Sequence, residues 1–225
     1  MFSLSMDHMK KNLVFLLSVF YLTLSCQNNN TKSIKSNAGV TLAPRNSNIS
    51  KAYFASGCFW CVEAIYESVY GVHEVISGYS GGFTKNPTYE LSNTGRTGHA
   101  EAVEIHYDNK LVSFSTLLEV YFGSQNISQV NGQGPDIGSQ YRSIIFYKNP
   151  SQKALIIEKI KEIEKIKNIK VAAEVYPFQK FWKAEGYHQD YERLHPNNPY
   201  VRSVSVPRLK RFKEKFPHLL KQNHK

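Results

Sequence analysis

Two cysteines, three residues apart, are the side chains of this sequence best suited to chemistry. Cys58 and Cys61 lie in the segment 57–61, GCFWC, which follows an apolar segment at 52–56 and precedes apolar residues that recur at helical spacing. We therefore expect a short buried strand and then an amphipathic helix with Cys58 in its first turn. Unpaired backbone N–H groups and the positive end of a helix dipole favour an anion, so we expect a lowered pKa for the Cys58 thiol. Cys61, one helical turn further on, can meet the Cys58 sulfur, and this arrangement points to nucleophilic or redox chemistry.

The N-terminus has the pattern of an export signal. Lys10 and Lys11 precede a short apolar run at 13–22, which is typical of a secretory signal and too short for a membrane span. The run ends in LTLSC, which resembles the cleavage box of bacterial lipoproteins and makes Cys26 the predicted lipidated residue, although Thr23 departs from the aliphatic residue preferred there. The alternative is an ordinary cleaved signal followed by a disordered leader.

These observations divide the chain into three parts. We predict a signal peptide of the lipoprotein type at 1–25, a disordered tether rich in Asn, Ser, Thr and Lys at 26–50, and one folded domain at 51–225. The expected location is outside the cytoplasm, on a membrane anchor that faces the periplasm or the cell surface.

The number of cysteines agrees with this division. Three cysteines in an exported chain leave one without a partner, and a lipid on Cys26 accounts for it. A disulfide between Cys58 and Cys61 closes so small a loop that it stabilises a domain of this size little. The pair is therefore better explained by chemistry than by architecture.

The positive charge is concentrated at the C-terminus. The chain has a formal net charge of +10, and the segment 207–225 holds seven Lys and Arg residues against Glu214 alone, a balance of +6. Such a cluster can contact nucleic acid or anionic lipid. We favour a solvated terminal helix whose Phe212, Phe216 and Leu219 pack back on the domain, and we expect no nucleic-acid partner.

Helical and strand patterns mix without strict alternation, which favours the α+β class over a doubly wound sheet. Further strands are expected at 75–79, 102–107, 141–147 and 171–175, and helices at 114–122, 151–167 and 178–191.

Five motifs resemble, in their order along the chain, those of type A peptide methionine sulfoxide reductases. They are GCFWCVEA from Gly57, GYSGGFTKNPTYE from Gly78, TGHAEAVEI from Thr97, DIGSQYRS from Asp136 and YHQDY from Tyr187. The resemblance covers about residues 51–217. It implies an enzyme that reduces methionine S-sulfoxide, free or in proteins, without a metal or organic cofactor and with electrons from a thioredoxin-like dithiol. The expected fold is a single two-layer domain with a mixed central sheet flanked by helices, a ferredoxin-like core with extensions.

The resemblance assigns roles to named residues. Cys58 attacks the sulfoxide sulfur, and Glu101 donates a hydrogen bond or proton to the departing oxygen, with help from the hydroxyls of Tyr89 and Tyr141. A carboxyl buried among aromatic side chains has a raised pKa and stays protonated, as a donor must.

Binding and network roles are implied for four further residues. Phe59 and Trp60 resemble the apolar pocket for the methyl group on sulfur, with Gly57 beside them, and Asp136 is implied in the active-site hydrogen-bond network. Aspartate is also common in glycine- and proline-containing loops for turn reasons alone.

The chain departs from many family members at the resolving cysteine. Those members carry glycine where Cys61 stands and keep a resolving cysteine near the C-terminus, whereas no cysteine follows Cys61 here. We therefore expect Cys61 to attack the Cys58 sulfenic acid, giving a Cys58–Cys61 disulfide for the dithiol to reduce. The segment 198–203 also differs from the family pattern, so no family role is transferred to Tyr200.

Three alternatives remain open on the sequence alone. A thioredoxin-like dithiol oxidoreductase would leave Glu101 and the tyrosines without a role. A metal-binding or redox-sensing module could use both cysteines with His99 or His188, which we expect to be structural, but no second CxxC follows. A basic surface-binding lipoprotein explains the two ends of the chain and leaves the central motifs unused.

Overall fold

The computed structural model describes residues 48–222. The predicted signal peptide and Cys26, with nearly all of the tether, lie outside the described residues and stay predictions. Within residues 48–222, no helix combines the length and the apolarity that a membrane crossing needs.

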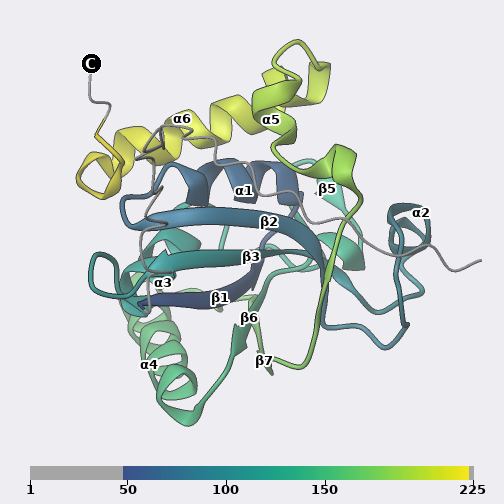
Figure 1. Ribbon diagram of the computed structural model, residues 1–225. Coiled ribbons are helices and arrows are strands. Elements are labelled where there is room, and N and C mark those ends of the chain that lie inside the picture. The colour runs from purple at the N-terminus through teal and green to yellow at the C-terminus, as the bar shows by residue number, and fades with distance from the viewer. Residues whose placement is uncertain (1–47, 223–225) are drawn as a thin grey trace, which may run out of the picture. The chain divides into compact units, whose positions relative to one another are not determined.

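One mixed sheet of six strands forms the centre of the fold (Figure 1). Its order is β7-β6-β1-β3-β2-β8, with β6 and β7 parallel and the other neighbours antiparallel. The strands are β1 Ile49–Ala55, β2 Val72–Ser80, β3 Ala100–Asp108, β6 Ile144–Tyr147, β7 Glu174–Pro177 and β8 Phe181–Lys183. The predicted α+β class with a mixed central sheet is confirmed.

The four inner strands have the ferredoxin-like arrangement. Helix α1, Phe59–Glu67, connects β1 to β2, and helix α3, Phe114–Gly123, connects β3 to β6. The spatial order β6-β1-β3-β2 then places the first strand between the fourth and the third. The βαββαβ core predicted for the chain is therefore present.

The remaining elements extend this core. They are α2 Tyr89–Asn93, the hairpin β4 Gly132–Gln133 with β5 Asp136–Ile137, α4 Pro150–Lys167, α5 Tyr191–Leu194 and α6 Val206–Lys215. Helix α4 has the signals of a well-defined helix, because Asn149 caps its first turn by accepting from the Gln152 N–H and Asn168 ends it in the left-handed conformation. It begins within one residue of the predicted start.

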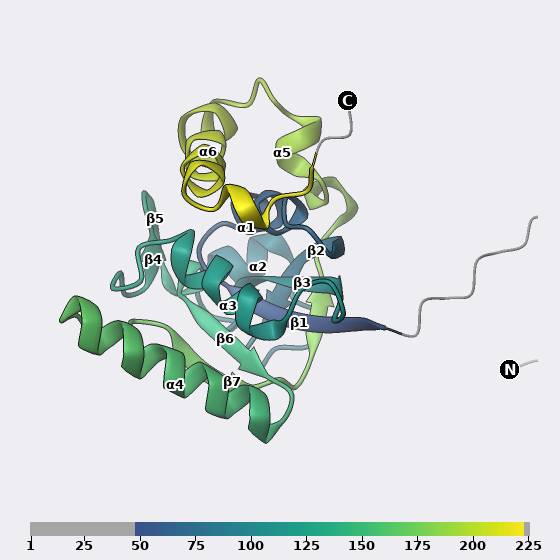
Figure 2. The ribbon, with the colours of Figure 1, turned by 90° about the vertical axis from the view of Figure 1, so that its left-hand side faces the viewer.

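Apolar side chains cover both faces of the sheet. The larger cluster joins the sheet to α1, α3, α4 and α6, with Phe54, Ile65 and Leu117 completely buried. On the other face, Tyr53 and Phe146 belong to a smaller cluster against which Phe178 and Phe181 pack. Figure 2 shows α6 over α1, on the side of α1 away from the sheet.

The helix predicted at 178–191 is wrong. Phe181 and Trp182 extend the sheet instead, pairing with Ser80 and Tyr79 of β2, and a 3₁₀ turn at Gly186–His188 then leads into the short helix α5. The aromatic residues of this segment fit a sheet edge as well as a helix face, and periodicity alone does not separate the two. The strand predicted at 171–175 begins at Glu174, three residues late.

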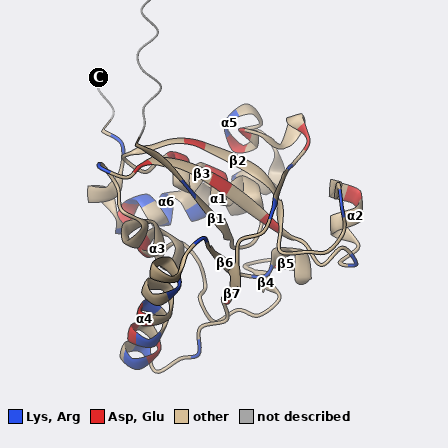
Figure 3. Cartoon of the chain, turned by 60° about the horizontal axis from the view of Figure 1, so that its bottom comes forward, with Lys and Arg blue, Asp and Glu red and all other residues tan. Residues whose placement is uncertain are grey.

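The predicted terminal helix is confirmed as α6. Phe212 is completely buried, and Phe216 and Leu219 pack against the main cluster. Figure 3 shows Lys and Arg residues along this helix. The expectation that its charges are solvated is wrong for one residue, because Arg208 is buried.

Candidate active site

The turn from β1 to α1 places Cys58 directly before the helix. Gly57 has φ +83°, and a Cβ atom added there would lie 2.5 Å from Cβ of Gln133, so both the backbone conformation and the space require glycine. Cys58 is the N-cap of α1, one position earlier than predicted, and its side chain makes no capping hydrogen bond. The N–H groups of the first helical turn are thus available to other acceptors.

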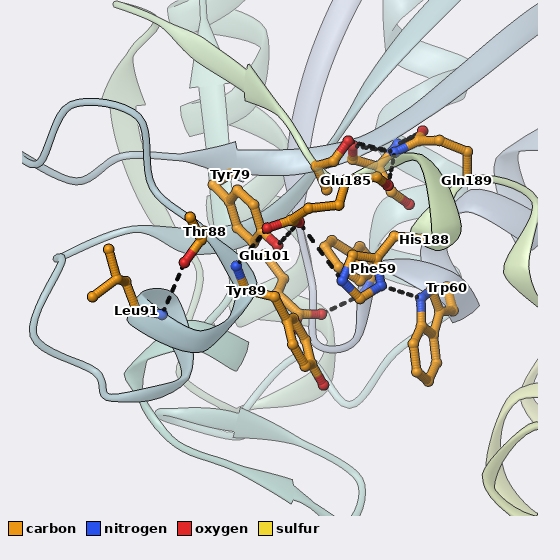
Figure 4. Close-up of polar contacts among 12 residues, drawn as sticks. Phe59, Trp60, Tyr79, Thr88, Tyr89, Leu91, Glu101, Glu185, His188 and Gln189 are labelled. Atoms are coloured by element: carbon orange, nitrogen blue, oxygen red, sulfur yellow. Dashed lines mark hydrogen bonds and ion pairs between the residues drawn. The ribbon is translucent and has the colours of Figure 1, made fainter.

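Glu101 of β3 takes one of these donors. Its Oε2 accepts from the backbone N–H of Phe59 at 2.9 Å (Figure 4). The carboxyl is buried, which raises its pKa to about 8; the Phe59 N–H opposes this rise, and the charges of Asp136 and Cys61 add to it. The direction agrees with the sequence-based expectation. A carboxyl that holds its proton near neutral pH therefore lies beside the residue that follows Cys58.

The two thiols form one buried unit. Cys58 and Cys61 are both free thiols and buried, and each shifts the pKa of the other. Burial raises the pKa of Cys58 well above its ordinary value, and the contact with Cys61 and the charge of Glu101 raise it further. The hydrogen bond from Cys58 is the main cause that lowers the pKa of Cys61 to about 6; burial opposes this, and the Arg208 charge assists it.

The predicted lowering of the Cys58 pKa is therefore wrong for the reduced protein. Removal from water disfavours a buried thiolate more strongly than one helix terminus favours it. Of the two thiols, Cys61 is therefore the one that ionises more readily in the reduced pair.

Tyr200 and Asp136 lie against the Cys61 side of the pair. The Tyr200 hydroxyl donates to Oδ2 of Asp136 at 2.6 Å, and its oxygen lies 3.7 Å from the Cys61 sulfur. Burial raises the pKa of Asp136, while Tyr200 and Arg208 oppose the rise. Sequence reasoning assigned Tyr200 no role, and no local pattern connects it to a cysteine 139 residues earlier.

Tyr89 and Tyr141 are half-buried and face the same site. Burial raises the pKa of Tyr141, and the charges of Glu101, Tyr89 and Cys58 raise it further. Burial likewise dominates the raised pKa of Tyr89, with contributions from Glu101 and Cys58. The structure thus brings together the cysteines, the carboxyl and both tyrosines that the resemblance singled out.

Glu185, which sequence reasoning missed, anchors this region. Its carboxylate accepts from the Tyr89 backbone N–H and from the Tyr79 hydroxyl, each at 2.9 Å (Figure 4). Burial works against ionisation, but the hydrogen bonds that the carboxylate accepts hold the pKa of Glu185 below its ordinary value. An ionised Glu185 therefore fixes α2, and with it Tyr89, against the sheet.

The aromatic residues after Cys58 pack against His188. Phe59 is fully buried, with its ring centroid 4.9 Å from that of His188. Trp60 is half-buried, stacks on Tyr191 at 3.7 Å and donates its Nε1–H to Nδ1 of His188 at 3.1 Å. Burial lowers the pKa of His188, so the ring is neutral and its observed contacts are structural.

His99 also makes structural contacts. Its Nδ1 accepts from the Gly82 N–H at 3.1 Å, and its Nε2 lies 2.8 Å from the Thr84 carbonyl oxygen. These bonds hold the glycine-rich loop after β2. Among residues 48–222, no group of three His, Cys, Asp or Glu side chains is placed to bind a metal ion.

Comparison with known proteins agrees with this site. A family model of peptide methionine sulfoxide reductases matches residues 50–220. The chain is 46% identical to the MsrA protein of Saccharolobus solfataricus over 170 residues, which is 76% of this chain and 96% of that protein. It is 44% identical to the MsrA protein of Pasteurella multocida over 171 residues, 76% of this chain and 98% of that protein.

Solved structures share the fold. Methionine sulfoxide reductase A of Corynebacterium diphtheriae superposes with a TM-score of 0.60 at 29% identity, covering 68% of this chain and 77% of that one. Mxr1 of Saccharomyces cerevisiae in its reduced form gives a TM-score of 0.62 at 28% identity, covering 68% and 89%.

The chain belongs to the peptide methionine sulfoxide reductase family. Within it, the chain is of the MsrA type and is an enzyme that reduces the S epimer of peptide methionine sulfoxide to methionine.

Proposed function

We propose that Cys58 carries the chemical step of this reaction. The Cys58 sulfur attacks the sulfoxide sulfur and passes its proton to the Cys61 thiolate, while Glu101 donates its proton to the sulfoxide oxygen. The S–O bond to the substrate breaks, the hydroxyl passes to Cys58 as a sulfenic acid, and methionine leaves. Sulfoxide and thiol thus become sulfide and sulfenic acid. The carrying observation is the bond from the Phe59 N–H to Glu101, because it fixes a protonated carboxyl next to Cys58.

In this proposal Tyr89 and Tyr141 assist Glu101 in stabilising the sulfoxide oxygen. Their neutral hydroxyls can donate hydrogen bonds to the sulfoxide oxygen as negative charge develops on it. Raised pKa values keep both hydroxyls protonated. Phe59 is too deeply buried to present much surface to a ligand, so of the two predicted pocket residues the half-buried Trp60 is better placed to contact the methyl group.

The second step is resolution by Cys61. Its sulfur attacks the sulfenic sulfur of Cys58, an S–S bond forms, and the hydroxyl leaves with a proton as water. The support is the position of two buried free thiols one helical turn apart, together with the low pKa of Cys61. A thioredoxin-like dithiol then reduces the disulfide by exchange, which returns both thiols.

Replacing Cys61 by serine separates the two steps. We expect Cys61→Ser to form about one methionine per protein, with sulfenic acid accumulating on Cys58, and to lose turnover supported by a thioredoxin-like dithiol, since sulfenic acid has no thiol partner left. Methionine release and dimedone labelling of Cys58 measure the two quantities.

The matched control is Cys26→Ser, which removes the only other cysteine of the sequence and keeps the pair. It should recycle like the unaltered protein. Sustained dithiol-dependent turnover by Cys61→Ser would remove Cys61 from the reaction.

We also propose that the enzyme is exported and anchored by lipid on Cys26, facing the periplasm or the cell surface, where it acts on free or protein-bound methionine sulfoxide. The support is the charged and apolar pattern at 10–22 and the LTLSC box. Cells fed labelled fatty acid should label the full chain in the membrane fraction and leave Cys26→Ser unlabelled. Equal labelling of the two proteins, or none, contradicts the anchor.

A further inference from the structure

The basic C-terminal segment holds one charge that is not at the surface. Arg208 of α6 is only 9% exposed. Its Nε donates to the Ser124 carbonyl at 2.9 Å, and its Nη1 donates to the Ser56 carbonyl at 3.1 Å. Ser56 lies two residues before Cys58, so the guanidinium is fixed against the turn that carries the reactive cysteine.

No carboxylate neutralises this guanidinium. In the ion pairs found among residues 48–222, Arg208 has no acidic partner within 4.0 Å. Burying an unpaired cation costs free energy, and a nearby anion offsets that cost. Asp136 lines the same region and the Arg208 charge opposes the rise of its pKa, but its carboxyl forms no ion pair with Arg208 and accepts a hydrogen bond from Tyr200 instead.

Arg208 and Cys61 line one cleft. The cavity has a volume of about 500 Å³, and Asp136, Arg211 and Lys215 contribute to its wall. Arg211 and Lys215 are exposed, so water screens their charges, whereas Arg208 acts across a low-dielectric interior. Arg208 is therefore the cation of α6 whose field reaches the Cys61 sulfur most effectively.

We propose that Arg208 is a positioning residue that holds the negative charge of the cysteine pair on Cys61 and keeps this thiol ionised for attack on the Cys58 sulfenic acid. The inference rests on the proposed role of Cys61 as the resolving cysteine. In the step concerned, Cys61 first gives up to water in the cleft the proton that it took from Cys58. Its thiolate then forms the S–S bond, the S–O bond of Cys58 breaks, and the departing hydroxide takes a proton from the same water to become water.

The other groups around Cys61 do not replace Arg208 in that step. Cys58, Ser205 and Tyr200 reach Cys61 by hydrogen bonds, and the charges of Glu101 and Asp136 are negative when present. The bond from the Cys58 thiol contributes most in the reduced protein, and this thiol no longer exists once Cys58 is a sulfenic acid. Arg208 is then the buried positive charge that remains at Cys61.

The test measures, as a function of pH, the rate at which the Cys58 sulfenic acid is converted to the Cys58–Cys61 disulfide. The rate of disulfide formation should rise with pH as Cys61 ionises. In Arg208→Gln the midpoint of this rise should lie about one pH unit higher, which makes the step up to about tenfold slower near pH 6. Arg208→Lys keeps the charge and should keep a midpoint near that of the unaltered protein. Arg211→Gln removes an exposed charge from the same cleft and should change nothing. Above these midpoints, where Cys61 is ionised in every variant, reduction of the sulfoxide in the first turnover should be equally fast in all of them.

A merely structural role would lower the rate equally at every pH. An unmoved midpoint in Arg208→Gln, or an equal shift in Arg211→Gln, overturns the inference, while failure of the unaltered protein to form the disulfide overturns the proposed role of Cys61 instead. If Arg208→Gln does not fold, the inference is tested in Cys58→Ser instead, by titrating the thiolate absorbance of Cys61 against pH. It should titrate below the ordinary cysteine value of about 8.5, and titration at or above that value overturns the inference.

Discussion

Replacing Cys58 by serine should abolish the reduction of methionine S-sulfoxide, including the first turnover. A serine hydroxyl stays protonated at every pH the protein survives, and Cys61 cannot draw its proton away as it can from the Cys58 thiol. The serine oxygen also cannot take up the hydroxyl group as a stable product, as the Cys58 sulfur does when it becomes a sulfenic acid. Quantifying methionine after mixing stoichiometric protein with the S epimer measures this directly.

Cys61→Ser serves as the matched control for this variant, because it makes the same atom change one helical turn away and should still yield about one methionine per protein. Any stoichiometric methionine from Cys58→Ser would assign the attack to another residue.

Replacing Glu101 by glutamine should slow the chemical step by a factor of about 10² to 10³, the range expected when a general acid is lost. Glutamine keeps the shape and can still accept from the Phe59 N–H, but it has no proton to transfer. Single-turnover rates of methionine formation report this step without interference from recycling.

The pH dependence provides a second signature of Glu101. The acid form is the active one and its pKa is raised to about 8, so the single-turnover rate of the unaltered protein should fall as pH rises through that value. The Cys61 thiolate accepts the Cys58 proton more readily than a protonated or serine side chain does, so the rate should also fall below about pH 6. Glu101→Gln should lose the alkaline fall and keep the acidic one.

Glu104→Gln is a suitable control, since it alters a carboxyl of the same strand that pairs with Lys51 outside the site. A normal single-turnover rate in Glu101→Gln, with the alkaline fall still present, would contradict the acid role.

Local patterns in the sequence identified the central part of the site. The GCFWC segment between an apolar strand and a helical repeat placed Cys58 within one residue of its position, because the periodicity that defines both elements is local. The role of Glu101 came instead from the resemblance of the TGHAEAVEI motif, since the strand predicted at 102–107 did not include it and β3 also carries Glu104, His106 and Asp108. Local periodicity thus located the cysteines, and the family motif located the carboxyl.

Tyr200, Glu185 and Arg208 could not be found in this way. They reach the site through bonds to Asp136, Tyr89 and Ser56, which span 64, 96 and 152 residues of sequence respectively. Their own neighbours in the sequence show no pattern that connects these side chains to the cysteines. Only the docking of the C-terminal segments on α1 gives these side chains their partners.

The error in the Cys58 pKa has a physical origin as well. A helix N-terminus stabilises an anion by about 0.3–1 kcal/mol in most settings, whereas full burial moves a pKa by as much as about 3–5 units. The sequence shows where the helix begins but does not show how little water reaches that point. Burial therefore outweighs the helix terminus at Cys58, and Cys61 is the thiol whose pKa is lowered.

The most direct test of the account follows both cysteines through one reaction with methionine S-sulfoxide. After one equivalent of the S epimer and no reductant, mass mapping of the unaltered protein should find one methionine released and a peptide in which Cys58 and Cys61 are joined by a disulfide. Methionine formed while both cysteines remain thiols would contradict the account.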